Sequence, residues 1–208
     1  MPVAKMEDVR STLEPYHNTI RQIVHEAWRE WRSIEAHRQA NDFGAVAYKR
    51  TISNYMFDAI ARRASRAFAA HDGIHIRAEA QTVKFHAGGD VLFRFKKGNA
   101  MKLGCNIPTQ AALAFIDANA MVPGLPPETA KVEIIWQPNE IWTEIERVLV
   151  IARDGDRVIW EYDLGAGEGG AMVIPFPMPV APEQTDEDEP PLVKPKPVSK
   201  PETGEDKK

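Results

Sequence analysis

Apolar residues in this chain follow two different spacings, and the change between them comes at Asp72-Gly73. Before this point they recur at steps of three and four, which places them on one face of a helix. From Ile74 they recur at every second position, which places them on one face of a strand. Because helical spacing precedes this point and strand spacing follows it, the long helices and the sheet are expected to occupy separate stretches of the chain. We therefore predict an α+β fold.

Two amphipathic helices are predicted before the change, over residues 13–40 and 44–70. Pro15 is compatible with the first turn of the first helix, where a missing N–H is tolerated, and the residues NDFG interrupt the pattern between the helices. Since the connection is short, the two helices are expected to form an αα-hairpin. The apolar stripe of the first comprises Tyr16, Ile20, Ile23, Val24, Ala27, Trp28, Trp31 and Ile34, and that of the second Ile52, Tyr55, Met56, Ala59 and Ile60.

Five strands and one short helix are predicted after the change. IHIRAEAQTVKFHA and DVLFRFKKG are interpreted as two strands joined at Gly88-Gly89, and KVEIIWQ, EIERVLVIAR and RVIWEYDL as three more beyond the short helix. The last two strands are joined at Asp154-Gly155, a pair that tolerates positive φ in hairpin turns. This order, ββ-α-βββ, indicates an antiparallel sheet with the helices packed on one face.

Composition divides the chain into three regions. Residues 1–72 form the helical region and residues 73–164 the antiparallel α+β region, and we expect these two to pack as one compact domain. Residues 165–208 are rich in glycine, proline and charge, so they are predicted to be a disordered tail that cannot bury enough apolar area to fold. No apolar run is long enough to span a bilayer, and the N-terminus lacks a signal-peptide pattern. We therefore expect a cytoplasmic protein with no membrane partner.

Motifs for catalysis or metal binding are missing from the sequence. The single cysteine, Cys105, lies in KLGCNIP without an activating motif and is interpreted as a structural thiol. His25-Glu26 begins like a zinc-protease motif, but Arg29 occupies the position of the second histidine ligand. Phosphate-binding loops, dinucleotide fingerprints and GxSxG are also missing. These observations predict a non-enzymatic protein with no catalytic residues, no metal and no cofactor.

Cations and aromatic residues alternate on and beside the first predicted hairpin. A basic sheet with aromatic side chains can hold phosphates and stack bases. Alternation nevertheless places Phe93 and Phe95 on the opposite face from Arg94 and Lys96, so the phenylalanines are expected to line the core. A nucleic-acid-binding or RNA-cleaving toxin therefore remains the alternative function. Its candidate residues are Lys84, Arg94, Lys96, Lys97 and Lys102.

The segment NIPTQAALAFIDANA, residues 106–120, has two interpretations. Thr109 can cap a helix, and the alanines that follow are strong helix formers, which favours a buried helix. Gln-x-x-Leu-x-Phe, at Gln110, Leu113 and Phe115, also has the chemistry of a docking peptide, because an amide sets the register and two apolar anchors fill pockets. In a helix Leu113 and Phe115 point about 200° apart, whereas in an extended segment they share one side.

This Gln-x-x-Leu-x-Phe segment resembles the hexapeptide by which many bacterial proteins dock on the β sliding clamp of DNA polymerase. Over residues 93–164, a Phe-Lys-rich strand, NIPTQ, PGLP and the final strands together resemble the SocB-type toxins of the SocA–SocB toxin–antitoxin systems. The resemblance implies a toxin that occupies the clamp through Gln110, Leu113 and Phe115 and blocks DNA replication. It also implies a SocA-like antitoxin that acts as a proteolytic adaptor and delivers the toxin to the ClpXP protease.

Overall fold

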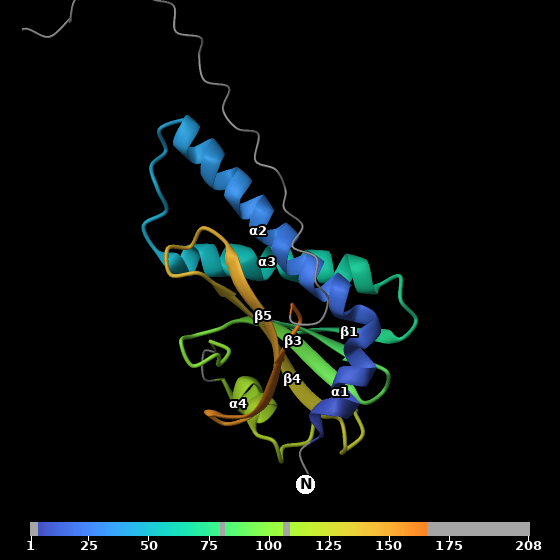
Figure 1. Ribbon diagram of the computed structural model, residues 1–208. Coiled ribbons are helices and arrows are strands. Elements are labelled where there is room, and N and C mark those ends of the chain that lie inside the picture. Colours follow the sequence, from blue (N-terminus) through green and yellow to red (C-terminus); the bar gives the residue numbers. More distant parts are fainter. Residues whose placement is uncertain (1–3, 80–81, 106–108, 166–208) are drawn as a thin grey trace, which may run out of the picture. The chain divides into compact units, whose positions relative to one another are not determined.

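The structure, a computed structural model, describes residues 4–79, 82–105 and 109–165. These residues fold as α+β, with helices in the first part of the chain and a six-stranded sheet in the second (Figure 1). The described residues all belong to one compact unit. The predicted tail, apart from Gly165, lies outside the described residues. Within the described ranges, no helix combines the length and the apolarity needed to cross a membrane.

The N-terminal helices confirm the αα-hairpin and extend it by one helix at its start. Helix α1 spans Met6–Leu13, a single 3-10 turn η1 spans Glu14–Tyr16, α2 spans His17–Ala40 and α3 spans Lys49–Phe68. Pro15 lies in the 3-10 turn η1, and proline has no backbone N–H to donate to a regular α-helix. The long helix α2 therefore begins at His17, later than the predicted residue 13. Apolar positions of α2 and α3, including Ile20, Trp28 and Met56, are buried as the spacing predicted.

The six strands lie in the sheet in their order along the chain. They are β1 (Ile74–Glu79), β2 (Thr82–Ala87), β3 (Val91–Lys97), β4 (Ala130–Pro138), β5 (Ile145–Asp154) and β6 (Arg157–Asp163), and α4 (Gln110–Ile116) lies between β3 and β4 in sequence. Every neighbouring pair is antiparallel except β3 and β4, which are parallel. The element order is therefore βββ-α-βββ and the sheet is mixed.

Two details of the predicted sheet are corrected. The stretch IHIRAEAQTVKFHA is not one strand but the antiparallel pair β1 and β2, which the sequence hides because AEAQT contains none of the usual turn residues. The sheet is not wholly antiparallel, because residues 98–129 carry the chain back to the start of the next strand. A parallel pair needs such a long crossover connection, and this one contains α4.

One face of the sheet packs against α1, α2 and α3 and forms the main core. Phe85, Phe93 and Phe95 point to this face. Phe85 and Phe93 meet Phe68 of α3, with ring centroids of Phe68 and Phe85 5.2 Å apart, and Phe95 packs on both Phe85 and Phe93. The alternation predicted for β3 is thereby confirmed, since its phenylalanines are buried beneath the helices and Arg94 points to the other face. Burial of several large aromatic side chains is the main stabilising term of this layer.

The other face carries a smaller apolar cluster and α4. Leu103, Ile135, Leu149 and Ile151 are buried together there. Figure 1 shows α4 on the side of the sheet away from α2 and α3. The prediction that all helices pack on one face is therefore wrong for α4. The crossover connection brings this helix to the opposite face.

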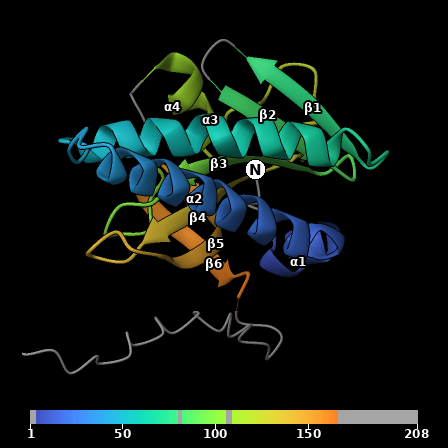
Figure 2. The same ribbon diagram turned by 90° about the horizontal axis from the view of Figure 1, so that it is seen from above.

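Strands β2 and β3 diverge toward one end. Their register covers only Phe85–Ala87 of β2 and Val91–Phe93 of β3, although β2 begins at Thr82 and β3 continues to Lys97. By contrast, β1 and β2 stay paired to their shared end, where Glu79 lies opposite Thr82. Figure 2 shows the β1–β2 hairpin on one side of α3 and strands β4, β5 and β6 on the other. The sheet is thus open between β2 and the end of β3.

Candidate functional site

Helix α4 is the segment in which sequence predicted either a buried helix or a docking peptide. Its helical form and its cap are confirmed, because Thr109 adopts an extended backbone and its Oγ1 accepts a hydrogen bond from the N–H of Ala112 at 3.2 Å. The predicted clamp motif therefore lies in a helix of seven residues, Gln110–Ile116. So short a helix has little stability of its own and depends on its contacts.

The three motif residues do not share one environment. Gln110 is exposed, and its side chain makes no hydrogen bond within the described part of the chain. Leu113 is 44% exposed, whereas Phe115 is only 4% exposed. A helix separates positions 113 and 115 by about 200°. The structure therefore presents Gln110 and Leu113 to solvent and turns Phe115 toward the sheet.

Phe115 lies over two cations at the opening between β2 and β3. The guanidinium carbon of Arg94, on β3, is 4.0 Å from the ring centroid, and Nζ of Lys84, on β2, is 5.7 Å from it. Both distances fall within the range of cation–π attraction. Phe115 thus links two strands at a place where their backbone ladder is missing, and it is the buried anchor of α4.

The C-terminal end of α4 is held by a lysine from the sheet. Nζ of Lys131, on β4, donates to the carbonyl oxygens of Ala114 at 3.1 Å, of Ala120 at 2.5 Å and of Asp117. Free carbonyl groups and a partial negative charge gather at the end of a helix. One ammonium group therefore satisfies three carbonyls at the point where α4 passes into the loop that follows.

The five cations proposed for nucleic-acid binding do not form one exposed stripe. Lys84 pairs with Glu79 at 2.7 Å, Arg94 pairs with Glu133 at 2.6 Å, and Lys102 pairs with Glu161. Only Lys96 and Lys97 have no carboxylate partner among the described residues, and both are half-buried. Burial lowers the pKa of each of these two lysines.

A buried charge network that the sequence did not reveal lies next to α4. Glu133 accepts hydrogen bonds from Nη2 of Arg94 at 2.6 Å and from Nη1 of Arg153 at 3.2 Å, and all three side chains are at most 8% exposed. Gly104 lies so close to Glu133 that a Cβ at this position would collide with the carboxylate. Burial lowers the pKa of Arg94, which the nearby Glu133 opposes. The sequence does show charged residues at alternate positions of β3, β4 and β5. Which of these residues pair with one another depends on the order of the strands, which the sequence alone does not show.

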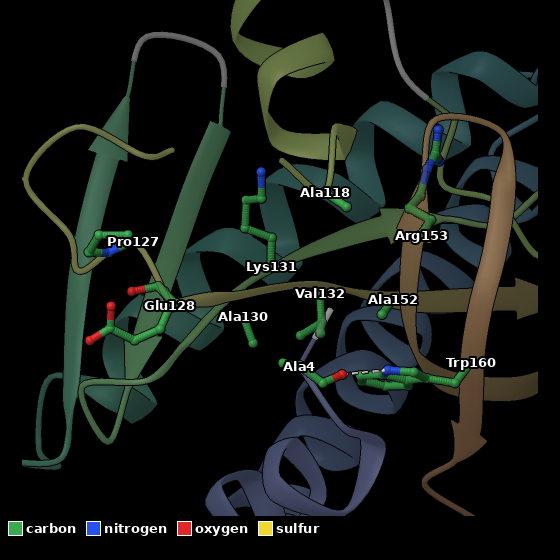
Figure 3. Close-up of a pocket in the computed structure, with 11 residues that line it drawn as sticks. Ala4, Ala118, Pro127, Glu128, Ala130, Lys131, Val132, Ala152, Arg153 and Trp160 are labelled. Atoms are coloured by element: carbon green, nitrogen blue, oxygen red, sulfur yellow. Dashed lines mark hydrogen bonds between the residues drawn. The ribbon is translucent and has the colours of Figure 1, made fainter. Parts of the chain in front are cut away.

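A small cavity of about 200 Å³ lies beside this network, between β4, β5 and β6 (Figure 3). Nε1 of Trp160 donates to the carbonyl oxygen of Ala4 at one side, at 2.9 Å. Lys131 and Arg153 also line the cavity, and Figure 3 shows both pointing away from Trp160. Lys131 already donates to carbonyl oxygens at the end of α4, and Arg153 is already ion-paired with Glu133, so these polar groups have partners. This cavity is therefore a packing feature near the N-terminus.

Neither Cys105 nor the histidines assemble a reactive centre in the described ranges. Cys105 is exposed and free. No group of three or more His, Cys, Asp or Glu side chains gathers there as a metal site would require. His75 and His86 face each other across β1 and β2, with ring centroids 6.4 Å apart, but no carboxylate completes a site around them.

Comparison with models of protein families, with curated proteins and with solved structures finds no match to this chain. The resemblance to the SocB-type toxins and the partners that it implies therefore stay predictions. The exposure of Gln110 and Leu113 and the burial of Phe115 are the observations on which a functional proposal can rest.

Proposed function

We propose that this protein is a non-enzymatic toxin that inhibits DNA replication by docking on the β sliding clamp through Gln110, Leu113 and Phe115. The observation that supports this function is the exposure of Gln110 and Leu113 on a short helix that carries one buried anchor. The amide of Gln110 is available as both donor and acceptor, and Leu113 offers an apolar side chain to a pocket.

Docking with both apolar anchors requires a change in α4. Leu113 and Phe115 must come to the same side, so the helix must become extended at its C-terminal half. Withdrawing Phe115 from the sheet costs about 2–3 kcal/mol of apolar burial, and about 1 kcal/mol of cation–π attraction is lost as well. The clamp pockets rebury the same side chain, which offsets most of this cost. The seven-residue length of α4 keeps the remaining cost of unwinding small.

The partners of this function follow from the resemblance to the SocB-type toxins. They are the β sliding clamp, a SocA-like antitoxin that acts as an adaptor, and the ClpXP protease that degrades the delivered toxin. Degradation of the delivered toxin would keep replication free until the antitoxin is lost. No step of this scheme requires a catalytic residue in this chain.

A direct binding assay with purified clamp tests the proposal. Gln110→Ala and Leu113→Ala are the informative variants, because both side chains are exposed and their removal leaves the fold intact. Each should weaken clamp binding by roughly tenfold or more and should relieve growth inhibition in cells. Ile141→Ala is the matched control, since Ile141 is an exposed apolar residue outside α4. Unchanged clamp binding in the two α4 variants, or an absence of clamp binding in the native chain, would show that the proposed function is wrong.

A further inference from the structure

A cleft of about 940 Å³ opens where β2 and β3 diverge. Helix α3 lines one side of it, the diverging strands line the middle, and Thr109, Ala111 and Ala112 beside and within α4 line the other side. Sites for small organic ligands have volumes of roughly 300–1,000 Å³. The cleft is therefore large enough for a ligand of nucleotide size.

The lining of this cleft is strongly cationic. Six cations contribute to it, and Glu79 is the only acid among its described lining residues. Glu79 pairs with Lys84, and Glu133 of the neighbouring strand β4 pairs with Arg94. The other four cations have no carboxylate partner in the described part of the chain. They are Lys49, Arg50, Lys96 and Lys97.

Two of these four cations are held in a partly dry environment. Lys96 and Lys97 are half-buried, and burial lowers the pKa of each lysine. Lys97 Nζ lies 4.4 Å from the centroid of the Trp142 ring, and Lys49 Nζ lies 5.3 Å from the same ring, so one aromatic side chain holds both ammonium groups near each other. Unpaired ammonium groups in such a place are costly, and an anion bound between them removes that cost.

The remaining walls of the cleft are apolar or offer single polar atoms. Phe57 of α3 is half-buried, and Phe95 of β3 is nearly fully buried beside it in the lining. Thr82 Oγ1 is buried and has no hydrogen-bond partner among the described residues. A buried hydroxyl without a partner is uncommon in a folded protein and favours a ligand that supplies one. Charge, apolar surface and a free hydroxyl thus occur in one cleft.

We propose that this cleft is a binding site for a small organic phosphate. The phosphate lies among Lys49, Arg50 and Lys97, and the apolar part of the ligand packs against Phe57 and Phe95. A phosphate carries up to two negative charges and three acceptor oxygens, so it suits a group of unpaired cations better than a single carboxylate does. The proposed ligand contacts do not use Gln110, Leu113 or Phe115, although Ala111 and Ala112 of α4 form part of the cleft wall.

A small ligand is favoured over a nucleic-acid strand by the shape of the site. A strand needs an extended groove with cations along its length. Here Lys102 and Lys84 are paired with carboxylates, and the free cations gather inside one cleft. Binding of a long nucleic-acid strand is therefore less favoured, and titration with an oligonucleotide tests it.

The test is calorimetric titration of the full chain with adenosine monophosphate, pyrophosphate, adenosine and a single-stranded oligonucleotide. We expect adenosine monophosphate to bind roughly tenfold or more tightly than adenosine, and pyrophosphate to compete with it. Lys49→Met and Lys97→Met should each weaken this binding by roughly tenfold, and Lys97→Arg should keep most of it. Lys102→Met is the matched control and should bind as the native chain does, because Lys102 lies outside the cleft.

Three results would overturn the proposal. The first is an absence of binding of both adenosine monophosphate and pyrophosphate by a chain whose melting temperature is native. The second is an equal loss of affinity in Lys102→Met and in the cleft variants. The third is binding of the oligonucleotide alone with a steep dependence on salt, which would identify a nucleic-acid surface.

Discussion

The ring of Phe115 covers the guanidinium of Arg94, whose central carbon lies 4.0 Å from the ring centroid. The same guanidinium is ion-paired with Glu133 beneath it. The one buried residue of the clamp motif is therefore stacked on a buried charge network of the sheet. This contact couples the conformation of α4 to the stability of the sheet.

Replacing Phe115 by alanine should destabilise the protein by about 3 kcal/mol, because a nearly fully buried aromatic side chain is lost and Arg94 becomes uncovered. Urea-induced unfolding measures this free energy. Leu113→Ala serves as the control and should change it by no more than about 0.5 kcal/mol, since Leu113 is largely exposed. Equal effects of the two substitutions would mean that Phe115 does not anchor α4.

Glu133→Gln should destabilise the fold by about 3–5 kcal/mol, because it leaves the cations of Arg94 and Arg153 buried without their shared counter-charge. Thermal and urea unfolding report the change. Glu161→Gln, which removes the half-buried partner of Lys102, is the matched control and should cost at most about 1 kcal/mol. A similar small loss in both variants would show that burial adds nothing to the Glu133 network.

Stability should fall in acid through Glu30 of α2. A hydrogen bond from Tyr55, together with Arg63 and Arg62, lowers the pKa of Glu30 from 4.5 to about 2. Because the folded pKa is the lower one, the stabilisation is complete above about pH 5 and is lost as the pH falls toward 2. In Glu30→Gln, the loss of stability over this pH range should be smaller than in the native chain. Unfolding curves measured from pH 7 to pH 2 test this expectation.

The control for the pH experiment is Glu35→Gln on the same helix. Within the described ranges, Glu35 pairs only with Arg32, three residues earlier. This variant should keep the acid dependence of the native chain. If Glu30→Gln and the native chain lost stability in parallel, the network around Glu30 would not be its source.

Features set by local spacing were predicted well from the sequence. The change of spacing at Ile74 gave the α+β class, Thr109 was recognised as a helix cap, and alternation placed Phe93 and Phe95 in the core. The helical geometry of residues 110–116 also implied that Leu113 and Phe115 would point apart, as they do. These properties depend on a few neighbouring residues and are therefore visible in the sequence.

Features set by long-range pairing could not be predicted in this way. Alternation assigns Arg94 and Glu133 to faces of their strands, but only the parallel pairing of β3 and β4 makes them neighbours. The cleft depends on the incomplete ladder between β2 and β3, and no local pattern marks where a ladder stops. The position of α4 on the second face likewise depends on the crossover connection. The positions of both candidate sites therefore depend on strand pairing and on the crossover connection.

Lys131→Met should increase the affinity for the clamp if docking requires α4 to unwind. The substitution removes the ammonium group that satisfies the carbonyl oxygens of Ala114, Asp117 and Ala120, so the helix end becomes easier to open. When only a fraction of the molecules is competent to bind, raising that fraction lowers the apparent Kd in proportion. Clamp titration measures the affinity, and faster amide hydrogen exchange in α4 should accompany the gain.

Lys102→Met is the matched control for this experiment, because it removes a half-buried lysine that pairs with Glu161 and does not contact α4. Its clamp affinity and its exchange in α4 should be native. Faster exchange in Lys131→Met without tighter clamp binding would show that the helical form of α4 does not limit docking. Weaker binding would mean that the clamp recognises the intact helix through Gln110 and Leu113, with Phe115 remaining on Arg94.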